Sequence, residues 1–182
     1  GSGQDTYLFA AGHGKDTIDD PGYADGGSIL RFLGAKAASA TFERVGASLV
    51  IKAYGGGDSV TLWNYFQDSE SSKSHYRDSS IVFDDATLTA EDLATRVITF
   101  TGTDANDSQS GWYGVDRMTG GAGNDTLSSG SDNDILEGGE GKDSLNGEAG
   151  SDILDGGAGD DWLMGGSGQD TYLFAAGHGK DT

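Results

Sequence analysis

The sequence predicts an all-β protein in which a right-handed parallel β-roll is joined to a small antiparallel β cap with one short helix. Three observations lead to this fold class. Eight aspartates follow one another at intervals of nine residues in the C-terminal half. One apolar residue recurs two positions after each of the last six. In the N-terminal half, polar residues alternate with β-branched and aromatic ones between glycine-rich turns, which is typical of short strands.

The nine-residue repeat predicts the roll. In the clearest registers the sequence reads GGAGNDTLS from Gly120, GGEGKDSLN from Gly138 and GGAGDDWLM from Gly156. One apolar position in nine is too sparse for an amphipathic helix or a long strand. It fits a very short strand whose middle residue points into a narrow core, followed by a six-residue turn. Two such repeats would complete one coil of the chain, so aspartates eighteen residues apart would stack on the same edge.

The turns predict a metal site built from oxygen atoms. Consecutive glycines allow positive φ, so carbonyl oxygens can point at a common centre beside an aspartate carboxylate. Calcium prefers such all-oxygen sites. We expect several Ca²⁺ ions, at most six from the regular repeats, between neighbouring aspartates on two edges. The candidate ligands on one edge are Asp107, Asp125, Asp143 and Asp161, those on the other edge are Asp116, Asp134, Asp152 and Asp170, and the candidate turn glycines are Gly121, Gly123, Gly139, Gly141, Gly157 and Gly159.

Charge supports a metal that takes part in folding. Residues 102–173 contain 15 acidic and two basic side chains, a net charge of −13. Such a segment repels itself unless cations neutralise it. We therefore expect metal binding to contribute to the free energy of folding.

The repeat is less regular in places. Gln109 and Met118 replace the inward leucine in the first two registers, so we expect the first coil to be a capping turn with weak or absent calcium. Asp132 and Glu148 stand where glycine is usual. Asp5 and Asp16 lie eleven residues apart, as if two residues were inserted into a last turn, and are weaker candidate ligands; His13 is expected to be solvated.

The segment between the repeats predicts the cap. Apolar runs begin at Ser28, Ala40, Ser48, Ser59 and Ser79 and are separated by turn signals. Thr89 followed by Asp92 predicts a capping box for a helix over about 90–97. We expect three parts: the end of a roll block over 1–20, the β cap over 21–101, and the roll over 102–182.

Eight phased copies of the repeat resemble the GGxGxDxUx motif of RTX proteins, the haemolysin-type calcium-binding nonapeptide family. Residues 5–96, through DTYLFAAGHGKDTID, SLVIKAYGGGDSVTLWNYF and SSIVFDDATLTAEDL, resemble the haemolysin-type calcium-binding related domain. The resemblance implies a calcium-binding module of a secreted bacterial toxin or adhesin, extracellular or on the cell surface after type I secretion. It also implies that the cap assists folding of the roll during export.

Other function classes receive less support from the sequence. The net charge of −19 disfavours binding to nucleic acid or to an anionic membrane, and no apolar stretch is long enough to span one. The chain has no cysteine, no HExxH motif and no GxSxG motif, so we expect no enzyme. A glycan- or receptor-binding platform is an alternative use of the aromatic residues, which are more simply read as core: Trp63, Tyr65, Phe66, Tyr76 and Phe83.

Residues 1–17 recur unchanged at 166–182, so that Gly1 is equivalent to Gly166 and Thr17 to Thr182. This identity indicates either a tandem array or an engineered duplication. Because the first residue is glycine, we expect a fragment of a larger protein. A calcium-stiffened spacer of a surface adhesin is therefore a second interpretation, and the identical ends raise the question of head-to-tail association between molecules.

Overall fold

The computed structural model of the chain describes residues 4–19, 27–63, 65, 79–94 and 96–182. It divides into two compact units, Gly1–Ala94 and Thr95–Thr182, which are described separately below. The boundaries expected at residues 20 and 101 remain a prediction.

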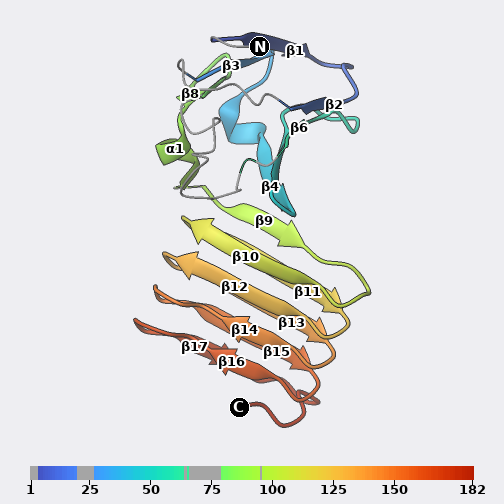
Figure 1. The fold of residues 1–182 in the computed structure, drawn as a ribbon, viewed down its shortest axis with the longest axis vertical. Helices are drawn as coiled ribbons and strands as arrows, with labels where there is room; N and C mark the ends of the chain where they lie inside the picture. Colours follow the sequence, from blue (N-terminus) through green and yellow to red (C-terminus); the bar gives the residue numbers. More distant parts are fainter. Residues whose placement is uncertain (1–3, 20–26, 64, 66–78, 95) are drawn as a thin grey trace. The chain divides into compact units, whose positions relative to one another are not determined.

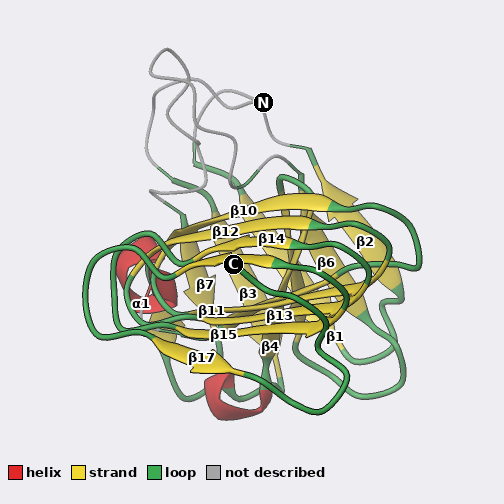
Figure 2. Cartoon of the chain, turned by 90° about the horizontal axis from the view of Figure 1, so that it is seen from below, coloured by secondary structure: helices red, strands yellow, loops and turns green. Residues whose placement is uncertain are grey.

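The second unit is a parallel β-roll whose successive strands fall alternately into two sheets (Figure 1). Seen along the roll, the two sheets form two layers (Figure 2). One sheet has the order β10-β12-β14-β16, from Ser108–Tyr113, Thr126–Ser131, Ser144–Asn146 and Trp162–Met164. The other has the order β17-β15-β13-β11-β9, from Thr171–Leu173, Ile153–Ala158, Ile135–Glu140, Asp116–Ala122 and Ile98–Thr101.

The register shows that one coil takes eighteen residues. Leu127 pairs with Leu145, which pairs with Leu163, and Leu136 pairs with Leu154 in the opposite sheet. These side chains point inward and are buried, and Phe100 packs against their cluster. The core of the roll is therefore a single file of apolar side chains between the two sheets, as the spacing predicts.

The expectation of a capping turn at the first coil is wrong for its shape. β10 pairs with β12, and β11 pairs with both β9 and β13, all in parallel. Met118 and Gln109 occupy the inward positions and are buried. The flexible Met118 side chain fills the space of a leucine, and Gln109 Nε2 donates a 2.8 Å hydrogen bond to the Ser110 carbonyl. The side-chain amide is thus satisfied inside the roll, so the coil stays regular.

The first unit mixes parallel and antiparallel pairs. Its strands are β1 Thr6–Ala10, β2 Lys15–Ile18, β3 Ile29–Leu33, β4 Thr41–Val45, β5 Ser48–Lys52, β6 Ser59–Leu62, β7 Ser80–Val82 and β8 Thr87–Leu88. The pairs β4–β5, β5–β6 and β7–β8 are antiparallel, as expected. The pair β3–β7 is parallel, so the expectation of an antiparallel cap over 21–101 is wrong at this pair. The pairs β1–β3 and β2–β6 are also parallel, but β1 and β2 lie within residues 1–20, outside the expected cap. β1 and β2 lie in different sheets, and each pairs in parallel with a later strand.

The aromatic residues of this unit divide between core and surface. Tyr65 and Phe83 are buried, in keeping with a packing role, whereas Trp63 is half exposed. Phe66 and Tyr76 lie outside the described residues.

Two short helices complete the first unit. A 3₁₀ helix spans Ala37–Ser39, and α1 spans Ala90–Ala94 rather than reaching residue 97. The capping box before α1 is confirmed: the Thr89 amide donates to Asp92 Oδ2 at 2.8 Å, and the Asp92 amide donates to Thr89 Oγ1 at 3.3 Å. No helix in the described part of the chain is long and apolar enough to cross a membrane.

Candidate metal centre

Aspartates from successive coils form two hydrogen-bonded rows, one on each edge of the roll. In each row the main-chain N–H of one aspartate donates to Oδ1 of the aspartate one coil further along the chain. The distances are 2.8 Å each for Asp107 to Asp125, Asp125 to Asp143 and Asp143 to Asp161, and 2.7, 2.9 and 3.1 Å for Asp116 to Asp134, Asp134 to Asp152 and Asp152 to Asp170. Aspartates eighteen residues apart therefore stack as the sequence predicts.

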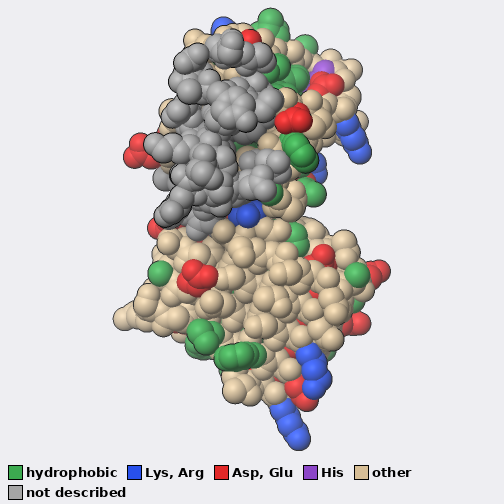
Figure 3. Space-filling view, viewed as in Figure 1, with side chains coloured by type: hydrophobic (Ala, Val, Ile, Leu, Met, Phe, Trp, Pro, Cys, Tyr) green, Lys and Arg blue, Asp and Glu red, His purple; other side chains and the backbone are tan. Residues whose placement is uncertain are grey.

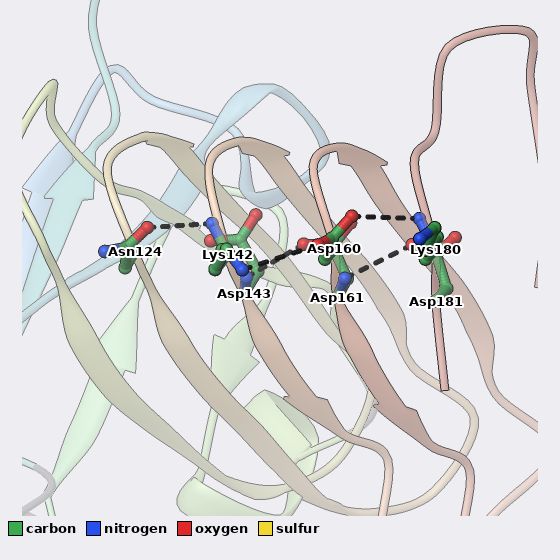
Figure 4. Close-up of polar contacts among 7 residues, drawn as sticks. All are labelled: Asn124, Lys142, Asp143, Asp160, Asp161, Lys180 and Asp181. Carbon is green, nitrogen blue, oxygen red and sulfur yellow. Dashed lines mark hydrogen bonds and ion pairs between the residues drawn. The ribbon is translucent and has the colours of Figure 1, made fainter.

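The first row continues past the regular repeats. The Asp161 amide donates to Asp181 Oδ1 at 3.2 Å, although Asp181 lies twenty residues away (Figure 4). The last turn thus accommodates two additional residues without interrupting the row.

In five of the row aspartates the second carboxylate oxygen is available to a cation. Among the described residues, Oδ2 has no hydrogen-bond partner and is buried in Asp125, Asp134, Asp143, Asp152 and Asp161. A buried polar atom without a partner is costly, so its retention at five successive positions indicates a ligand.

A main-chain carbonyl oxygen of the next coil lies close to Oδ2 in three of these residues, Asp125, Asp143 and Asp152. A Cβ atom placed on Gly138 would collide with Asp143 Oδ2 and with the Gly156 carbonyl oxygen of the next coil. The same holds for Gly120, with Asp125 Oδ2 and the Gly138 carbonyl oxygen. Such a set of oxygen donors fits Ca²⁺. No three acidic or histidine side chains converge in the described part of the chain, so the remaining ligands would be main-chain carbonyls.

The glycine turns set the distance between coils. Gly141 has φ of +133°, and a Cβ atom there would overlap the Gly123 carbonyl oxygen of the previous coil. Only glycine permits this approach, because it has no Cβ and adopts positive φ readily. All the candidate turn glycines have positive φ: Gly121, Gly123, Gly139, Gly141, Gly157 and Gly159. Their role as calcium ligands remains a prediction.

Burial makes the negative charge of the rows unfavourable without a cation. It raises the pKa of Asp134 to about 7, although the hydrogen bond from the Asp116 amide acts in the opposite direction. Burial also raises the pKa of Asp143, Asp152 and Asp161, and like charges of stacked neighbours such as Asp125 and Asp170 add to the effect. A bound cation would offset both causes.

The outer candidates differ from the central ones. The Asp107 Oδ2 atom already has two protein donors, the Thr103 amide at 2.7 Å and Thr103 Oγ1 at 3.0 Å. Asp5 and Asp16 belong to the first unit and are not part of the rows. The Asp16 carboxylate instead contacts His13 Nδ1 at 2.9 Å.

A second set of hydrogen bonds, which the sequence reasoning missed, runs in the opposite direction. At five described positions, the amide of the residue before a row aspartate donates to a side-chain oxygen of the preceding coil. Examples are Asn124 to Asn106 Oδ1 at 2.8 Å, Lys142 to Asn124 Oδ1 at 2.8 Å and Lys180 to Asp160 Oδ1 at 3.1 Å, the last two being drawn in Figure 4. The frequent Asn, Asp and Ser at this position of the repeat is the signal that could have identified it.

Irregular positions are accommodated without loss of the rows. Asp132 and Glu148 have positive φ, 79° and 65°, where the repeat usually has glycine. Asp132 Oδ2 accepts a 3.2 Å bond from the Gly114 amide of the previous coil. On the face drawn in Figure 3, acidic side chains of the second unit appear only as scattered patches, in keeping with the burial of the row carboxylates.

Comparisons with known proteins agree with this geometry. Residues 110–145 and 137–172 match the model of the RTX calcium-binding nonapeptide repeat, and residues 49–90 match that of the haemolysin-type calcium binding protein related domain. The iron-regulated protein FrpA of Neisseria meningitidis serogroup C is 40% identical over 105 residues, 56% of this chain. The match spans 9% of FrpA, so the chain corresponds to a small part of that protein. The repeat match includes all five aspartates with a buried, unpaired Oδ2.

Proposed function

Because residues 110–172 belong to the RTX calcium-binding nonapeptide repeat family, we propose that this chain is a module that folds on binding Ca²⁺ outside the cell. In this role it would support type I secretion and extracellular folding of a larger secreted protein. The role is structural rather than catalytic.

The buried Oδ2 atoms of the two rows carry the proposal. Five carboxylate oxygens are buried without a hydrogen-bond partner in the described residues, and all but that of Asp134 lie beside a glycine of their own repeat. We propose Asp125, Asp134, Asp143, Asp152 and Asp161 as the principal ligands, with Asp116 and Asp170 completing the second row. Asp107, Asp5 and Asp16 are weaker candidates, because the carboxylates of Asp107 and Asp16 already have protein partners.

Calcium concentration would act as the folding signal. At the micromolar or lower calcium of a cytoplasm, self-repulsion of the acidic repeats favours the unfolded, exportable chain. At millimolar calcium outside the cell, the ions bind the folded state alone and stabilise it by mass action. The narrow core, with one apolar side chain per repeat, leaves a large share of the stabilisation to the ions.

A calcium-stiffened spacer of a surface protein is the second candidate function. The unchanged recurrence of residues 1–17 at 166–182 favours it, because identical segments at the two ends of one unit are expected of a tandem array. A glycan-binding role has less support, since Tyr65 and Phe83 are buried.

Far-ultraviolet circular dichroism during a calcium titration tests the proposal, with magnesium as the control and calorimetry for the stoichiometry. We expect a cooperative gain of β structure near millimolar calcium, several ions bound, and no transition with magnesium. A full β signal of the roll in calcium-free buffer would contradict the folding switch. The spacer function would survive that result, provided that the ions still bind and raise the unfolding temperature.

A further inference from the structure

Residues 5–17 and 170–182 have the same sequence and share the contacts of one turn in the two units. His Nδ1 lies 2.9 Å from Asp Oδ2 in both copies, His13 with Asp16 and His178 with Asp181. The phenylalanine and histidine rings have centroids 5.3 Å apart in both, Phe9 with His13 and Phe174 with His178. The surroundings of the two copies differ. The aspartate side of the segment is covered in the second copy, and the phenylalanine side is covered in the first.

In the second copy, the preceding coil of the roll covers the aspartate side. β17 pairs with β15, Asp181 Oδ1 accepts the Asp161 amide, and the Thr182 carbonyl accepts the Leu163 amide at 2.8 Å. The Asp181 side chain is therefore only 4% exposed. In the first copy β1 is the edge strand of its sheet, and the equivalent Asp16 side chain is 46% exposed.

In the first copy, the following strands cover the phenylalanine side. Phe9 stacks on Phe32 with ring centroids 5.1 Å apart, and Tyr54 Oη donates to the Phe9 carbonyl at 3.0 Å. Phe9 is 7% exposed, whereas the equivalent Phe174 is 58% exposed. The His13 side chain is 12% exposed, which corrects the expectation that it is solvated, whereas His178 is 37% exposed.

Asp58 closes the turn of the first copy from the same side. Its carboxylate accepts the Gly12 amide at 2.6 Å and the Gly14 amide at 3.0 Å, and these bonds lower its pKa. Gly177 and Gly179 are the equivalent residues of the second copy and have similar φ, 96° and 86° against 87° and 86°.

The following strand in the first copy and the preceding coil in the second copy pair with opposite edges of the segment. In the first copy the Asp5 carbonyl accepts the Ile29 amide of the following strand. In the second copy the Thr171 amide, one position further along, donates to the Asp152 carbonyl of the preceding coil. Polar groups of adjacent residues in a strand point to opposite edges. One segment can therefore be paired on both sides at once.

We propose that the exposed Phe174 face is a docking surface for residues 28–62 of a following copy of this unit. In a chain that repeats the unit in tandem, two successive copies share one segment. It forms the last coil of the roll in one copy and the first two strands of the following copy. Thr171 then pairs with Ile29 of the next copy, Phe174 stacks on its Phe32, and its Asp58 binds the amides of Gly177 and Gly179. The last coil of one copy and the first strands of the next copy are then joined without a flexible linker.

A two-unit chain, residues 1–182 followed by a second copy of 18–182, tests the proposal in saturating calcium. The chain has no cysteine, so single Phe174→Cys, Phe9→Cys and Leu173→Cys variants report local exposure through their rates of thiol modification. In the single unit we expect Phe174→Cys to react quickly and Phe9→Cys slowly. At the junction of the two-unit chain we expect Phe174→Cys to slow at least about tenfold, which corresponds to about 1.4 kcal/mol of protection.

Controls separate docking from other effects. Leu173→Cys should react quickly in both chains, because Leu173 and its equivalent Leu8 are both exposed. Asp58→Ala in the second copy alone should restore fast modification at the junction. His178→Cys is an independent probe, expected to slow in the same way as Phe174→Cys.

Fast modification of both junction probes, in a two-unit chain that binds twice the calcium of one unit, would overturn the proposal. It would leave the calcium-binding function intact. The proposal rests on a folded roll, so a single unit that bound no calcium would instead count against the proposed function.

Discussion

The main-chain N–H of Asp134 donates a 2.9 Å hydrogen bond to Oδ1 of Asp152, one coil further along the roll, while Oδ2 of both carboxylates is buried without a partner in the described residues. One oxygen of each aspartate therefore holds neighbouring coils together, and the other is available to a cation. The same carboxylate links the backbone geometry of the roll to its charge.

Asp152→Asn separates these two roles. The amide side chain keeps an oxygen for the Asp134 amide but loses the negative charge. We expect the calcium stoichiometry to fall by one or two ions and the midpoint of the folding titration to rise about tenfold, since calcium affinity depends on ligand charge. Calorimetry and circular dichroism measure the two quantities.

Asp160→Asn is the matched control for that variant. Asp160 has an exposed side chain, and asparagine keeps the oxygen that accepts the Lys180 amide. It should leave stoichiometry unchanged. Equal loss of calcium in both variants would show that overall charge, rather than the buried rows, binds the ions.

Without calcium, acid should stabilise the roll. Burial raises the pKa of Asp134 from its ordinary value of 3.8 to about 7 and raises those of Asp143, Asp152 and Asp161. A group with a raised folded-state pKa stabilises fully below its unfolded pKa and loses that contribution as pH rises through the folded value. In calcium-depleted buffer, the β signal of the roll in circular dichroism should therefore be largest near pH 4 and fall as the pH rises to about 7. A rise over this range would contradict the burial of charged carboxylates.

The single file of apolar side chains should be sensitive to truncation. Leu154 is fully buried, so Leu154→Ala in saturating calcium should cost about 2–5 kcal/mol of unfolding free energy. The neighbouring Ile153 is partly exposed on the same strand, and Ile153→Ala should cost about 1 kcal/mol or less. Urea unfolding measures both, and similar losses would mean that the file is not the core.

Gly141→Ala should prevent normal stacking of the coils. The new methyl group would overlap the Gly123 carbonyl oxygen, so we expect loss of cooperative calcium-induced folding. Gly46→Ala controls for backbone strain alone, because Gly46 has φ of +57° and open space around it. That variant should cost about 1–2 kcal/mol. Normal calcium titration of Gly141→Ala would show that the coils can separate without loss of the sites.

The roll could be predicted from the sequence because its information is local and repeated. The spacing of Asp125 and Asp143 gives the eighteen-residue coil, and Leu127 gives the inward position. The regular shape of the first coil was not predicted, because Gln109 interrupts the apolar pattern. In the structure its side-chain amide is satisfied by a hydrogen bond to the Ser110 carbonyl. No sequence pattern predicts this hydrogen bond.

The cap was less predictable, because strand patterns indicate which residues are buried but not which strands pair. The run at Ile29–Leu33 is compatible with parallel or antiparallel pairing, and the structure pairs it in parallel with both β1 and β7. The burial of His13 likewise depends on its contacts with the rings of Phe9 and Tyr54, which come from separate parts of the chain.

The identity of residues 1–17 and 166–182 has a consequence for inheritance. If every junction in an array is made from the same seventeen residues, gain or loss of a whole unit by recombination leaves all remaining junctions chemically unchanged. Length could then vary between related genes in steps of one whole unit, with no compensating mutation required.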